Sequence, residues 1–76
     1  MVTEAATEGM TLTVNGSDRT VPTGTTLAAL LTQLSLDPRM IVVELNRTIV
    51  RERDRFAEMV LSSGDSLELV HFVGGG

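Results

Sequence analysis

The sequence predicts an α+β domain, in which a mixed sheet of four to five strands carries one main helix on one face. Three observations favour this class. An alternating apolar run over residues 10–14 ends in Asn15-Gly16, which is the strongest short hairpin signal. Leucines at positions 27, 30, 31 and 34 form one helical stripe. Two further strand-like segments, residues 40–45 and 66–73, supply the rest of the sheet.

The first half of the chain predicts a hairpin followed by the helix. Residues 10–14 alternate with a period of two, as a half-buried strand does, and residues 19–22 form the second strand. Pro22 marks the end of that strand because proline cannot donate a hydrogen bond to the sheet. Thr25 is the expected N-cap of the helix, and Asp37-Pro38 stops the helical pattern.

The second half predicts three more strands. Residues 40–45 are rich in β-branched residues, and Asn46-Arg47 turns the chain into a short strand at residues 48–50. Phe56 is the expected core anchor of the polar segment 51–57. A turn at residues 62–65 leads into the last strand, residues 66–73, which we expect at the centre of the sheet, parallel to the first strand.

This element order is that of the β-grasp, or ubiquitin-like, fold. We expect the β-grasp domain to span residues 10–73. Residues 1–9 lack a periodic apolar pattern and predict a flexible N-terminal extension, so that Met10 is an alternative start. Residues 74–76 predict a flexible glycine tail.

Composition excludes several function classes. The chain has 76 residues and no cysteine, no apolar run approaches the roughly 20 residues of a membrane span, and the N-terminus does not resemble a secretory signal, so we expect a cytoplasmic protein. The sequence pI of about 4.7 and the absence of lysine argue against nucleic acid as a partner.

Catalytic residues are scarce. The single histidine, His71, has no recognisable nucleophile partner, and Glu44, Glu68 and His71 lack the spacing of a metal site. We therefore expect neither an enzyme nor a bound metal or cofactor, and we expect His71 to be a solvated or hydrogen-bonded strand residue rather than a ligand.

The three glycines at the end of the sequence offer a different chemistry. Gly74, Gly75 and Gly76 span at most about 10 Å when extended and are narrow enough to enter a tight channel. A glycyl carboxylate at Gly76 has no Cβ to hinder attack on its carbonyl carbon. Three glycines alone are equally compatible with a chain end that has no function. The other segments of the sequence must therefore distinguish between the two interpretations.

The last strand also predicts a docking face. Alternation places Leu67 and Leu69 in the core and places Glu68, Val70 and Phe72 on the opposite side, where exposed apolar residues indicate a partner site. The alternative is that Phe72 folds over a sheet edge. Four of the six arginines, at positions 47, 51, 53 and 55, are expected to form a solvated face or to steer an acidic partner.

Taken in order, these segments resemble the ThiS family of thiamine-biosynthesis sulfur carriers over residues 10–76. The matching segments are Asn15-Gly16, residues 24–27 with the paired leucines 30–31, residues 43–46, 49–51, 63–65 and 67–70, and residues 72–76. The chain departs from the family pattern at Arg51, where proline is common, and at Phe56, where tryptophan or tyrosine is frequent. The related small subunit of molybdopterin synthase shares the fold and the diglycine end.

The resemblance implies a carrier cycle centred on Gly76. A ThiF-like adenylyltransferase would use ATP and Mg²⁺ to adenylate the Gly76 carboxylate, a persulfide donor would convert it to a thiocarboxylate, and a ThiG-like thiazole synthase would accept the sulfur. Gly74 and Gly75 would be recognised as the tail, and ATP would not be a cofactor of this chain. The alternatives are a sulfur carrier for molybdopterin synthesis, a ubiquitin-like modifier conjugated through Gly76, and a plain interaction module.

Overall fold

The computed structural model describes residues 9–72, which form one five-stranded sheet, one α-helix and two 3-10 helices. Residues 1–8 and the predicted glycine tail, residues 74–76, lie outside the described residues, as does Val73. In chain order the elements are β1 (Gly9–Val14), β2 (Ser17–Pro22), α1 (Leu27–Gln33), η2 (Pro38–Met40), β3 (Ile41–Leu45), β4 (Thr48–Val50), η3 (Arg53–Glu58) and β5 (Ser66–His71).

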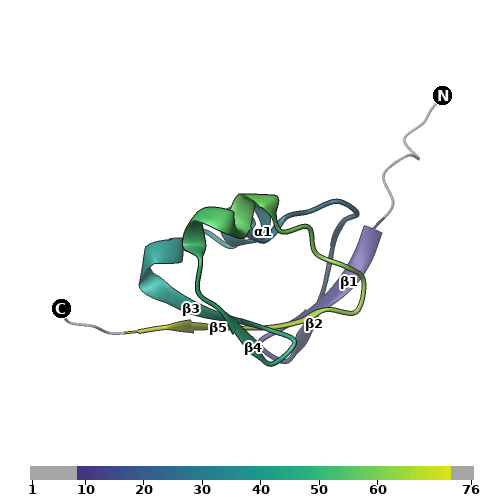
Figure 1. Ribbon diagram of the computed structural model, residues 1–76. Coiled ribbons are helices and arrows are strands. Elements are labelled where there is room, and N and C mark those ends of the chain that lie inside the picture. The colour runs from purple at the N-terminus through teal and green to yellow at the C-terminus, as the bar shows by residue number, and fades with distance from the viewer. Residues whose placement is uncertain (1–8, 73–76) are drawn as a thin grey trace.

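The last strand, β5, lies at the centre of the sheet, whose strand order is β2-β1-β5-β3-β4. It runs parallel to β1, with Leu67 opposite Val14, and antiparallel to β3, with Leu69 opposite Val43. Figure 1 shows α1 and η3 on one side of this sheet. The β-grasp prediction is confirmed, including the central position of the last strand and its parallel pairing with the first.

Both hairpins close through tight turns in which two residues have positive φ. The φ angles are 51° at Asn15 and 83° at Gly16 in the first turn, and 51° at Asn46 and 73° at Arg47 in the second. This geometry matches the right-handed twist of the flanking strands, and asparagine adopts positive φ more readily than most residues. The Asn15-Gly16 hairpin prediction is therefore confirmed, and the second hairpin uses the same geometry without a glycine.

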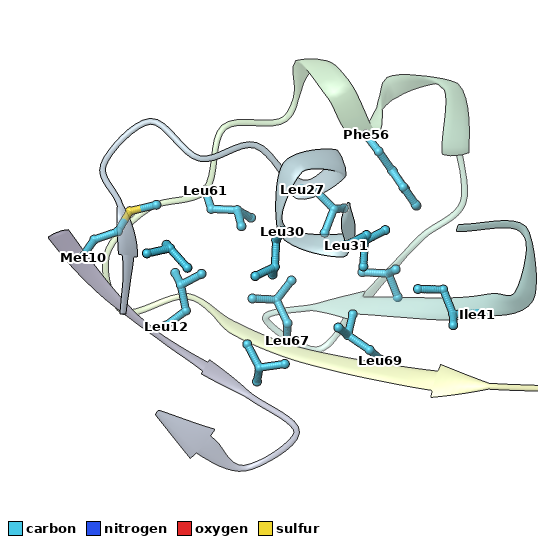
Figure 2. Close-up of a cluster of buried hydrophobic side chains, with 13 residues drawn as sticks. Met10, Leu12, Leu27, Leu30, Leu31, Ile41, Phe56, Leu61, Leu67 and Leu69 are labelled. Carbon is cyan, nitrogen blue, oxygen red and sulfur yellow. The ribbon is translucent and has the colours of Figure 1, made fainter. Parts of the chain in front are cut away.

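The core lies between α1 and the sheet. Leu27, Leu30 and Leu31 of the helix are at most 1% exposed and face Leu12 and Leu67 of the sheet, as Figure 2 shows. Burying one such side chain contributes about 1.5–3 kcal/mol, so these leucines are a large part of the stability of a domain without disulfides. Phe56 of η3 is buried beside them, as the sequence predicts.

The helix begins one residue later than predicted. Its N-cap is Thr26, whose Oγ1 accepts a hydrogen bond from the backbone N–H of Ala29 at 3.1 Å. The hydroxyl of Thr25 is already used, because Thr25 Oγ1 donates to the carbonyl of Pro22 at 2.6 Å and the residue is buried. The prediction of Thr25 as N-cap is wrong for this reason.

Four strand boundaries differ slightly from the prediction, including that of β3, which starts at Ile41 because Met40 belongs to η2. The first turn needs only Asn15 and Gly16, so β2 starts at Ser17 rather than residue 19. The first strand starts at Gly9, one residue before Met10, and β5 ends at His71 rather than residue 73. Within residues 9–72, no helix has both the length and the apolar character needed to cross a membrane.

Candidate functional site

The C-terminal end of β5 fixes the position from which the chain continues toward the three glycines. The backbone N–H of Phe72 donates to the carbonyl of Met40 at 3.2 Å, and the N–H of Met40 donates to the carbonyl of Asp37 at 2.9 Å. Phe72 is thereby held against η2. Gly74, Gly75 and Gly76 lie outside the described residues, so their roles in recognition and chemistry stay predictions.

The predicted docking residues lie on the side of the sheet opposite α1, which we call the outer face. Glu68 is exposed, Val70 keeps 55% of its surface exposed and Phe72 keeps 41%. Leu67 and Leu69 point the other way into the core, where Figure 2 shows them below the helix. The predicted alternation of the last strand is confirmed, and it leaves large apolar side chains in contact with solvent.

The structure adds neighbours that the sequence did not identify. Val42 of β3 pairs with Val70, and Glu44 of β3 pairs with Glu68 on one side and with Ile49 of β4 on the other. Val42 and Ile49 are 37% and 42% exposed. Alternation within β3 puts Val42 and Glu44 on one side of that strand, but it does not reveal which strand lies next to β5. We call the following outer-face residues the docking patch: Val42, Glu44, Ile49, Glu68, Val70 and Phe72.

The other half of the outer face is polar. Thr11 and Thr13 of β1 pair with Thr20 and Asp18 of β2, and Thr13 Oγ1 donates weakly to Asp18 Oδ1 at 3.4 Å. The exposed apolar side chains of the outer face are therefore confined to β3, β4 and the end of β5. This is the half of the sheet from which the chain leaves toward the glycines.

Charged side chains hold η2 in place beside Phe72. Asp37 caps η2 by accepting from the backbone N–H of Arg39 at 2.9 Å, and it forms an ion pair with the Arg39 guanidinium, also at 2.9 Å. The hydrogen bond from the Arg39 side chain, followed by the one from its backbone, lowers the pKa of Asp37 from its ordinary 3.8 to about 2. The carboxylate of Asp37 therefore stays ionised at any pH at which the protein works.

The predicted arginine run divides into different roles. Arg53 Nε donates to the carbonyl of Pro38 at 2.7 Å, and Arg53 Nη2 donates to the carbonyl of Ile41 at 3.3 Å, so this side chain joins η3 to the start of η2 and to the first residue of β3. Arg55 forms only a long, exposed ion pair with Glu58 at 3.8 Å. Arg47, Arg51 and Arg55 are solvent-exposed, which agrees with the predicted solvated face. Arg53 instead has a structural role, which the number of charges in the sequence could not reveal.

A shallow hollow lies beside the docking patch, at the edge formed by β3, β4 and η3. Its volume is about 230 Å³, and its lining includes Val42, Ile49 and Phe56 together with Arg51 and Arg53. The docking patch thus adjoins a depression whose lining combines apolar side chains with two arginines.

The residues considered for metal binding or catalysis do not converge. Glu44 and Glu68 lie opposite each other, but His71 pairs with the buried Ile41 and therefore belongs to the other side of the sheet. No group of three or more histidine, aspartate or glutamate side chains within residues 9–72 could hold a metal ion. His71 is exposed, as expected. What the described residues offer is an exposed, partly apolar surface next to the end of β5.

Comparison with known proteins gives a consistent family. A family model described as the ThiS family matches residues 10–76. The chain is 38% identical over 66 residues to the sulfur carrier protein ThiS of Bacillus subtilis, covering 86% of this chain and 98% of that protein. It also superposes on the crystal structure of a thiamine biosynthesis protein (ThiS) from Geobacter metallireducens with a TM-score of 0.74 and 33% identity, covering 88% of this chain and 100% of that one.

A larger protein contains a similar segment. The chain is 40% identical over 67 residues to a thiazole synthase of Paramagnetospirillum magneticum. The alignment covers 88% of this chain but 20% of that enzyme, so the chain spans about a fifth of the relative's length. The similarity therefore concerns one segment of the synthase.

Proposed function

The chain belongs to the ThiS family, and we propose that it is a sulfur carrier for thiamine biosynthesis that is loaded at the carboxylate of Gly76. The observation that carries this proposal is the extent of the family match, which includes both the folded sheet and the three glycines at residues 74–76. The sheet supplies a stable body and an exposed face, and the glycines supply the reacting group. The chain then acts as a protein substrate of other enzymes.

The first step of the cycle is activation of the carboxylate. A carboxylate oxygen of Gly76 attacks the α-phosphorus of ATP, pyrophosphate leaves, and an acyl-adenylate forms. ATP and Mg²⁺ belong to an adenylyltransferase, whose metal ion offsets the phosphate charge. The adenylate makes the carbonyl carbon reactive because AMP is a far better leaving group than an oxide ion.

The second step introduces sulfur. The terminal sulfur of a donor persulfide attacks the Gly76 carbonyl carbon and AMP leaves, which gives an acyl disulfide. A thiol then attacks the donor's sulfur atom of that disulfide, releasing a Gly76 thiocarboxylate and forming a new disulfide with the donor. The chain has no cysteine, so both the persulfide and the thiol come from partner molecules.

The acceptor of the sulfur is a thiazole synthase. Support comes from the thiazole synthase of Paramagnetospirillum magneticum, which contains a segment similar to 88% of this chain. A sulfur-carrier segment and a synthase in one polypeptide indicate that the two act together.

The docking patch would align the chain on these enzymes. Val70 and Phe72 lie next to the tail, and Glu68 lies further back along β5. The four residues that follow Phe72 span at most about 14 Å, so a reacting centre must lie within that distance of the bound Phe72. Gly74 and Gly75 would occupy the channel between the docked sheet and that centre.

Extension of the chain tests the activation step. Adding one alanine after Gly76 should abolish pyrophosphate release by the cognate adenylyltransferase in the presence of ATP, because the carboxylate then lies one residue too far and carries a Cβ. An alanine added before Met1 is the matched control and should leave the rate unchanged. Continued activation of the C-terminally extended chain would show that the Gly76 carboxylate is not the reacting group.

A further inference from the structure

Two carboxylates face each other at the centre of the docking patch. Glu44 of β3 and Glu68 of β5 are directly paired in the antiparallel register, on the outer face of the sheet. Side chains opposed in this way have Cβ atoms about 5 Å apart, and like charges in such a pair destabilise the sheet. The fold therefore carries an unfavourable contact in the middle of an exposed surface.

Neither carboxylate takes part in an ion pair within residues 9–72. The ion pairs within residues 9–72 are Asp37–Arg39 and Arg55–Glu58, and neither involves Glu44 or Glu68. Arg53 is committed to the carbonyls of Pro38 and Ile41. Within residues 9–72, neither carboxylate of the pair is therefore neutralised by a direct ion pair, and Arg51, which lines the hollow beside Val42 and Ile49, forms none with them.

Apolar side chains surround the pair. Val42 and Val70 lie one step along β3 and β5 toward the tail, and Ile49 lies beside Glu44 on β4. A partner that covers these apolar side chains also removes water from the carboxylates. Burial of a carboxylate is costly unless a hydrogen-bonded cation accompanies it.

We infer that the docking patch binds a surface of thiazole synthase that places an arginine or lysine side chain between Glu44 and Glu68 and apolar side chains over Val42 and Val70. Arginine suits the site best because its planar guanidinium has five donors and can bridge two carboxylates. This inference rests on the proposed function, from which it takes the identity of the partner.

A second copy of this chain is a poor occupant of the same surface. Dimers are most often two-fold symmetric, with the same patch on both subunits. Such an arrangement would bring four carboxylates together, two from each copy, around Glu44 and Glu68. The charge of the patch therefore favours a different protein with a basic side chain in the interface.

The double variant Glu44→Gln, Glu68→Gln tests the inference because it removes the charge and keeps the size. We expect the dissociation constant for purified cognate thiazole synthase, measured by isothermal titration calorimetry, to rise at least about ten-fold, and its salt dependence to weaken. The variant should melt at the same temperature as the wild type or higher, since a like-charge contact is relieved. Reduced binding then cannot be attributed to unfolding.

Asp18→Asn is the matched control. It removes one carboxylate from the polar half of the same outer face and should leave the dissociation constant unchanged. Unchanged binding by the double variant, equal weakening by Asp18→Asn, or no binding by the wild type would each overturn the inference. The proposed function is judged separately, by thiocarboxylate formation in a reaction that contains no thiazole synthase.

Discussion

At the scale of single residues, two asparagines connect the hairpin turns to the central strand. Asn15 Oδ1 accepts from the backbone N–H of Leu69 at 2.7 Å, and Asn46 Oδ1 accepts from that of Ser66 at 2.9 Å. Each asparagine also adopts the positive φ that its turn needs. The sequence predicted both turns, but it did not predict these long-range bonds, because a turn signal is local and the strand that it contacts is not.

Asp37 gives a residue-scale prediction with a defined pH range. Because its folded pKa is about 2 and its ordinary value is 3.8, its contribution to stability is present above about pH 4 and is lost as the pH falls through 2. Arg39→Gln should raise the pKa of Asp37 toward 3.8, as followed by NMR titration of its carboxyl carbon. Arg55→Gln removes a guanidinium that contacts Glu58 and should leave the titration unchanged. An unaltered pKa in Arg39→Gln would contradict the assigned cause.

At the scale of elements, η2, η3 and the end of β5 form one unit. Arg53 of η3 donates to the carbonyl at the start of η2 and to that of the first residue of β3, and the Met40 carbonyl of η2 accepts from the backbone N–H of Phe72. The position of Phe72 therefore depends on a side chain 19 residues earlier in the chain. Figure 1 shows η3 and α1 on one side of the sheet, whereas the exposed side chains of the docking patch lie on the other. The unit is connected to the patch by the hydrogen bond between the backbones of Met40 and Phe72.

Removal of Arg53 tests this connection. Arg53→Ala should lower the free energy of unfolding by about 1 kcal/mol through the loss of hydrogen bonds to two carbonyls, and it should speed hydrogen exchange at the Phe72 amide. Arg55→Ala is the matched control, because its exposed ion pair is worth a few tenths of a kcal/mol at most. Chemical denaturation and amide exchange measure the two effects. Equal effects of both substitutions would show that Arg53 has no special role.

Sequence patterns predicted the elements better than the contacts between them. Periodicity identified the leucine stripe of α1 and the alternation of Glu68, Val70 and Phe72, because both follow from local geometry. The N-cap was misplaced because Thr25 and Thr26 are both competent caps, and only the Pro22 carbonyl distinguishes them. Val42, Glu44 and Ile49 were missed because strand order and register, which bring them to β5, are properties of the whole fold.

At the scale of the whole molecule, the sheet separates stability from recognition. One face packs against α1 around Leu67, and the other presents the docking patch. The central strand belongs to both, since alternate residues of β5 serve the core and the patch, and the same strand leads to the glycines. A small domain can therefore fix the point at which the chain leaves the sheet, at Phe72, relative to the surface by which an enzyme would recognise it.

The central claim is that Gly76 carries sulfur as a thiocarboxylate, and intact-mass spectrometry tests it most directly. The chain is incubated with its cognate adenylyltransferase, ATP, Mg²⁺, a persulfide donor and a thiol, and fragmentation then locates any change. We expect the mass gain of one oxygen replaced by sulfur, confined to a C-terminal fragment that contains Gly76 and absent when ATP is omitted. An unchanged mass under these conditions, or sulfur located elsewhere in the chain, would contradict the account.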